Sequence, residues 1–159
     1  MIYNLNILIP EIFLVFSIFI LLMLGVFIKS SYNIIAKLTL LVLFLLTFTL
    51  INYEAKTFKI FSESFIRDPL SDYIKILILV STFFVFSTSQ NFIKDNNLNK
   101  FEYPIIILIA VLGMFFMVSS NDLILFYLGL ELQSLSLYIL AVLAALPAFL
   151  ALRDPTAYL

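Results

Sequence analysis

The chain contains no cysteine and no histidine, and only 12% of its 159 residues are charged. Without these two residue types, the usual zinc, haem, iron–sulfur and thiol chemistries lose their ligands and nucleophiles. We therefore expect no metal site and no redox cofactor on this chain. The net charge is -1 and the charges are scattered, which argues against binding to nucleic acid.

What the chain has in excess is apolar side chains, which make up 64% of it and give a mean hydropathy of +1.16. This composition excludes an ordinary soluble domain and predicts an all-α integral membrane protein in contact with the lipid bilayer. A helix that spans a bilayer needs roughly 20 mostly apolar residues. Five apolar segments predict about five transmembrane helices, at about residues 9–28, 34–51, 73–88, 103–118 and 123–146.

One carboxylate, Glu131, lies inside the fifth apolar segment. At about 1.5 Å per residue it is about 12 Å along the helix from Leu123, which places it well inside the membrane. At 100° per residue, Tyr127, Ser134 and Tyr138 fall on the same stripe as the carboxylate. The opposite face is small and polar and suits close packing against a neighbouring helix; it carries Gly129, Gln133 and Ser136.

Two interpretations of Glu131 follow from its depth. A structural acid would be kept neutral by desolvation and hydrogen-bonded to a neighbouring helix. A proton-carrying acid would instead have its charge switched by a partner base. Placing an acidic side chain in the middle of a membrane costs about 2.5 to 3.5 kcal/mol of free energy, so such a residue normally has a function. The proton-carrying interpretation is therefore favoured.

Other charged residues lie near the expected helix ends. Pro10 and Glu11 suit the first turn of the first helix, so a helix-start role is favoured for Glu11. Residues 52–72 carry charges among phenylalanines and predict an interfacial loop with aromatic anchors. Lys75, in the first turn of the third helix, is expected to snorkel to the interface, with a place in an ion path as the alternative.

The last nineteen residues, 141–159, differ in composition from the rest. They contain six alanines and two prolines, whereas residues 1–140 contain three alanines in all. Isoleucine, lysine and asparagine are absent from this tail. We therefore expect residues 1–140 to be the transmembrane region and the tail to be foreign to it.

Four motifs carry a resemblance to a known family. They are LELQSLSLY at residues 130–138, IPEIFL at residues 9–14, DPLSDYIK at residues 68–75 and NDL at residues 121–123. In order and spacing they resemble subunit N (subunit 2 in mitochondria) of the proton-translocating NADH:quinone oxidoreductase, respiratory complex I. The resemblance covers residues 1 to about 140 and is to the N-terminal part of that subunit.

The resemblance implies the N-terminal part of an antiporter-like helical bundle. In that family a glutamate on the fifth helix pairs with a lysine on a later, broken helix, and the pair gates proton movement coupled to quinone reduction. Glu131 matches that glutamate, so the resemblance makes it a proton relay. The implied partners are the other membrane-arm subunits, and the implied location is a bacterial or mitochondrial inner membrane.

Three functions remain open from the sequence. The chain is expected to be a non-redox subunit fragment of the oxidoreductase, without a complete active site of its own. A multisubunit cation/proton antiporter is an alternative, because it shares the antiporter-like fold. A truncated, non-functional membrane fragment is the third, because the partner lysine and the later helices of the family are missing from residues 1–159.

Overall fold

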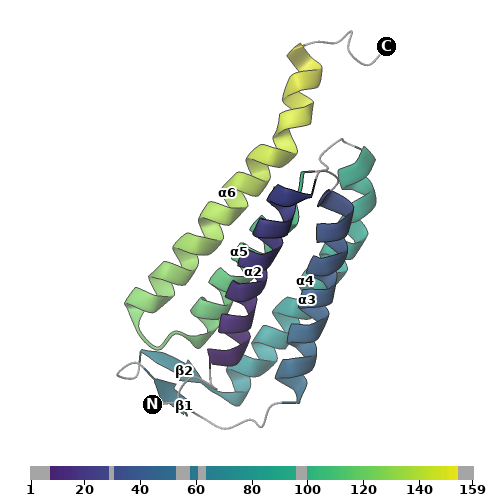
Figure 1. The fold of residues 1–159 in the computed structure, drawn as a ribbon. Coiled ribbons are helices and arrows are strands. Elements are labelled where there is room, and N and C mark those ends of the chain that lie inside the picture. The colour runs from purple at the N-terminus through teal and green to yellow at the C-terminus, as the bar shows by residue number, and fades with distance from the viewer. Residues whose placement is uncertain (1–7, 29–30, 53–57, 61–63, 96–99, 154–159) are drawn as a thin grey trace.

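A computed structural model describes residues 8–28, 31–52, 58–60, 64–95 and 100–153. Five long helices and one short hairpin account for most of them (Figure 1). The elements in chain order are α2 (Ile9–Phe27), α3 (Ser31–Ile51), β1 (Phe58–Ile60), β2 (Phe65–Arg67), α4 (Pro69–Asp95), α5 (Glu102–Ser119) and α6 (Leu123–Arg153).

Each of the five helices includes a stretch that is long and apolar enough to cross a membrane. The expectation of an all-α membrane protein with about five transmembrane helices is therefore confirmed. Large apolar side chains also point outward from the bundle, as in Phe19 at 65% exposure and Phe84 at 63%. Such a surface suits a hydrocarbon environment, where backbone polar groups must be satisfied within each helix, and the chain is an integral membrane protein.

The core lies between helices α2, α3, α4 and α5. Its fully buried members come from all four helices and include Leu14, Leu43, Leu79 and Leu108. Helix α6 packs along α5, and its C-terminal end extends beyond the ends of the other helices (Figure 1). Only 11% of its apolar stretch is buried, so most side chains of α6 are left uncovered by the described residues.

Helices α5 and α6 approach each other through glycine. A Cβ atom added at Gly113 would lie 2.8 Å from the backbone oxygen of Gly129 and 2.8 Å from the backbone nitrogen of Gln133. A Cβ atom at Gly129 would meet the backbone oxygen of Gly113 at the same distance. The prediction that the Gly129 face packs closely on a neighbouring helix is confirmed, and that neighbour is α5.

The structure differs from the sequence-based expectation in the described part of residues 52–72, which is residues 52, 58–60 and 64–72. Within this segment β1 and β2 pair as an antiparallel hairpin, with Lys59 opposite Ile66. The hairpin also bonds to the α5–α6 turn, where the backbone N–H of Asn121 donates to Ser64 O at 2.9 Å. Phe65 is only 2% exposed, so it is a core residue here and not an interfacial anchor. Tertiary contact with α5 and α6 explains the difference.

Helix α4 begins at Pro69, four residues before the expected start. Proline suits the first helical position because its missing N–H is not needed there. The backbone N–H of Asp68 donates to Ser71 Oγ at 3.0 Å, and Ser71 Oγ donates back to Asp68 O at 2.8 Å. These two bonds satisfy polar groups at the helix start, and the earlier start places Asp72 in the first turn of α4.

Candidate functional site

Glu131 lies on the side of α6 that faces away from the described bundle. Its side chain is exposed, and its neighbours on the same stripe, Tyr127 and Tyr138, are 61% and 67% exposed. Ser134 Oγ donates to the backbone oxygen of Glu131 at 3.0 Å and leaves the carboxylate free of it. Within the described part of the chain the Glu131 carboxylate has no ion-pair partner.

The opposite side of α6 is the buried one. Gly129 is buried, and Ser136 is 3% exposed and donates its hydroxyl to the backbone oxygen of Leu132 at 2.8 Å. The division of α6 into a packed face and an acid-bearing face therefore holds. A carboxylate placed at membrane depth on an open face needs a partner, because lipid cannot solvate it.

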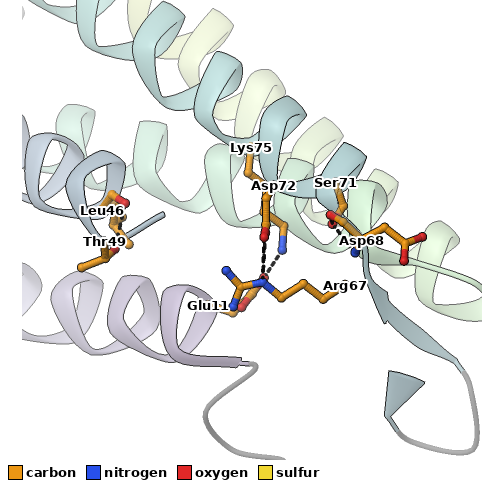
Figure 2. Close-up of polar contacts among 8 residues, drawn as sticks. All are labelled: Glu11, Leu46, Thr49, Arg67, Asp68, Ser71, Asp72 and Lys75. Atoms are coloured by element: carbon orange, nitrogen blue, oxygen red, sulfur yellow. Dashed lines mark hydrogen bonds and ion pairs between the residues drawn. The ribbon is translucent and has the colours of Figure 1, made fainter. Parts of the chain in front are cut away.

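A second group of charged residues lies inside the bundle, next to the hairpin (Figure 2). Lys75 Nζ donates to Glu11 Oε1 at 2.5 Å, joining α4 to α2 across 64 positions of the chain. The Lys75 side chain is 0% exposed and the Glu11 side chain is 3% exposed. The Lys75 ammonium also lies 5.5 Å from the ring centroids of Phe65 and Phe115, within the range of cation–π attraction.

This arrangement corrects one prediction and extends another. The prediction that Lys75 snorkels to the interface is wrong, because its ammonium is enclosed by two aromatic rings and paired with a carboxylate. Glu11 does lie in the first turn of α2, as expected. Its ion pair with Lys75 was not predicted, since sequence spacing says nothing about which helices become neighbours.

A second buried ion pair stands beside the first. Arg67 Nε, at the end of β2, donates to both carboxylate oxygens of Asp72, at 3.0 Å and 3.1 Å. Arg67 is 1% exposed and Asp72 is 8% exposed. Asp72 and Lys75 are three residues apart on α4 and so share one helix face. That spacing is the one sequence signal that could have pointed to a charged cluster here.

The described residues contain no group of three or more histidine, cysteine, aspartate or glutamate side chains that could hold a metal ion. The charged groups that the structure does bring together are two acid–base pairs. A carboxylate and an ammonium group, as in the Glu11–Lys75 pair, are both of a kind that can bind and release protons, whereas the guanidinium group of Arg67 keeps its proton. The fold and these groups define a multi-spanning α-helical membrane protein with ionisable residues inside its membrane region.

Several proteins of known family are similar to this chain in sequence. Subunit N of NADH-quinone oxidoreductase from Pelagibacter ubique is 45% identical over 141 residues, which is 87% of this chain and 30% of that subunit. The corresponding subunit from Parvibaculum lavamentivorans is 41% identical, over 83% of this chain and 28% of its own length. That from Rhodobacter capsulatus is 47% identical over 52% of this chain and 17% of its own length. No protein-family model matches the chain.

A solved structure agrees with the sequence relatives. A chain of respiratory complex I from Thermus thermophilus, determined with bound aureothin, superposes with a TM-score of 0.71 and 26% identity, over 83% of this chain and 28% of that one. The chain is thus homologous, over most of its length, to subunit N of NADH-quinone oxidoreductase. It spans about three tenths of the length of the Pelagibacter subunit.

Proposed function

We propose that this chain contributes part of a membrane-arm subunit of NADH:quinone oxidoreductase and takes part in moving protons across the membrane. The observation that carries the proposal is the position of Glu131. Between Asp122 and Arg153 it is the only charged residue, and it lies on the face of α6 that the described helices leave open.

An acid in that position needs a basic partner from outside the described bundle. Lys75 does not supply it, because its ammonium is already bound to Glu11 inside the bundle. We therefore place the partner on a helix that packs over the open face of α6. An opposite charge nearby favours the carboxylate, and withdrawal of that charge in a dry setting favours the neutral acid. Movement of the partner would thus make Glu131 take up and release one proton.

The role that we propose for this chain is proton transfer and not electron transfer. Neither cysteine nor histidine is present to ligate a haem or an iron–sulfur cluster. We propose the other membrane-arm subunits as its partners. The relatives named above come from bacteria, which favours a bacterial inner membrane as its location.

The test is substitution of Glu131 in the full-length subunit assembled into its complex. Glu131→Gln keeps the shape and much of the hydrogen bonding but cannot release a proton, whereas Glu131→Asp can. NADH-driven proton transport per assembled complex should fall about tenfold or more in the Gln variant and be largely retained in the Asp variant. Transport at the wild-type rate by an assembled Gln variant would end the proton-carrier proposal.

A further inference from the structure

The two buried ion pairs beside the hairpin differ in one chemical respect. In the Arg67–Asp72 pair both carboxylate oxygens accept a hydrogen bond from Nε, and an arginine side chain does not give up its proton in proteins. In the Glu11–Lys75 pair only Oε1 of the carboxylate is bound. Both members of that pair can change protonation state.

The second carboxylate oxygen of Glu11 is the atom of interest. Glu11 Oε2 is buried and has no hydrogen-bond partner among the described residues. A buried carboxylate oxygen without a partner is costly, because it has lost water and gained no donor in exchange. When the Lys75 ammonium withdraws, the Glu11 carboxylate becomes a buried, uncompensated charge, and a proton on Oε2 removes that charge.

The neighbouring groups leave Lys75 as the main control on Glu11. Among the described residues, the other charged side chains drawn near this pair are Arg67 from β2 and Asp72 from α4, and these two form an ion pair with each other (Figure 2). From α5 the pair meets the ring of Phe115 and no charged side chain. Among the described residues, Lys75 is therefore the cation that binds Glu11 directly, and an opposite charge at that distance favours the carboxylate.

We infer that the Glu11–Lys75 pair is a second proton-loading site of this subunit, separate from Glu131. The inference rests on the proposed function in proton transport. A hydronium ion in water at this end of the bundle gives its proton to Glu11 Oε2, which leaves neutral water, a neutral carboxylic acid and a charged Lys75. The reverse transfer to water restores the ion pair. No electron moves in either direction, and the charge of the pair alternates between zero and plus one.

The Glu11–Lys75 pair lies near the end of the bundle at which a transported proton would enter or leave. Lys75 lies six residues past the start of α4, about 9 Å along the helix, so the pair is within the membrane region but near one end. Glu131 lies about 12 Å along α6 from Leu123, and α4 and α6 both start at the hairpin end of the bundle (Figure 1). A proton entering or leaving at this end could thus be held at Glu11.

The experiment compares Glu11→Gln, Glu11→Asp and Lys75→Met with Asp72→Asn and Glu131→Gln, each in the full-length subunit within its assembled complex. Asp72→Asn is the matched control, because it removes a buried, paired acid whose partner cannot deprotonate. Proton transport is expressed per assembled complex, so that loss of folding is separated from loss of transport. Infrared difference spectra recorded during turnover report protonation of individual carboxylates.

We expect Glu11→Gln to lower transport per complex about tenfold or more, Glu11→Asp to restore part of it, and Asp72→Asn to reduce only the amount of complex. A carboxylic-acid band that appears during turnover should be missing in Glu11→Gln and retained in Asp72→Asn. Wild-type transport in Glu11→Gln beside impaired transport in Glu131→Gln would overturn this inference and leave the proposed function standing. Wild-type transport in both would overturn both, and a Glu11→Gln variant that loses only assembly would show a structural pair.

Discussion

Gly113 of α5 and Gly129 of α6 face each other so closely that a Cβ atom on either would lie 2.8 Å from the backbone oxygen of the other. This contact holds α6 against α5, and the described residues leave most of the remaining α6 surface uncovered. Small residues at a membrane helix interface let two backbones approach and gain van der Waals contact. The orientation of the acid-bearing face of α6 therefore depends on two glycines.

Gly113→Ala should destabilise the protein by about 1 to 3 kcal/mol, the usual cost of overpacking a tight contact. The added methyl would meet backbone atoms, which cannot turn aside. Gly25→Ala is the matched control: its methyl would meet the side chains of Phe101 and Ile35, which can move. Thermal unfolding in detergent should rank Gly113→Ala clearly below Gly25→Ala, and the reverse ranking would contradict the glycine contact.

The Glu11–Lys75 pair should also show coupling in stability. Removing one partner leaves a buried, uncompensated charge, which costs about 3 to 5 kcal/mol. Removing both leaves none, so the double variant Glu11→Gln with Lys75→Met should be more stable than the sum of the two single losses implies. A double-mutant cycle in the free energy of unfolding measures this coupling. Strictly additive single effects would mean that the two side chains do not interact.

Successive helices of the bundle run in opposite directions (Figure 1), which predicts the side of the membrane on which each connecting segment lies. Helix α3 ends and α6 begins at the hairpin end of the bundle, and α5 begins at the opposite end (Figure 1). Exposed residues beside these helix ends are Asn52 after α3, Asp122 before α6 and Lys100 before α5. The chain has no cysteine of its own, so single cysteines can be placed at these positions in a subunit cleared of others. A membrane-impermeant thiol reagent should reach Asn52→Cys and Asp122→Cys from one side and Lys100→Cys from the other. Labelling of all three from one side would contradict the five-span topology.

The tail composition leads to a genetic prediction. We propose that residues 141–159 are foreign to the preceding region, because alanine and proline rise there while isoleucine, lysine and asparagine disappear. The genomic reading frame should then change near Ala141. A single uninterrupted frame with the same codon usage through Leu159 would refute this proposal.

Much of the fold could be predicted from the sequence, because a bilayer imposes helix length and apolarity directly on it. The Gly129 face of α6 was predictable for a similar reason, since helical periodicity alone groups Gly129 with Ser136. The sequence-based prediction starts the third helix at residue 73, four residues after α4 begins at Pro69. Pro69 and Ser71 carry the helix-start signal, but the apolar run begins only after Asp72.

The hairpin and the ion pairs were not predictable in the same way. Three-residue strands such as β2 have no clear periodicity, and β2 is held by contacts with β1 and with the α5–α6 turn. The Glu11–Lys75 contact joins residues 64 positions apart, so only the tertiary arrangement of the bundle, which brings the start of α2 near the start of α4, creates it. Local rules instead favoured snorkelling for Lys75, which the aromatic rings of Phe65 and Phe115 rule out here.

The most direct test of the central claim is an exchange between this chain and a known relative. Residues 8–140 would replace the matching part of subunit N in Parvibaculum lavamentivorans, which is similar to this chain over 133 residues, with and without Glu131→Gln. We predict that the exchanged subunit assembles and supports NADH-driven proton transport, and that Glu131→Gln lowers transport per assembled complex about tenfold or more. An assembled complex whose transport is the same with glutamate and with glutamine at position 131 would contradict the account.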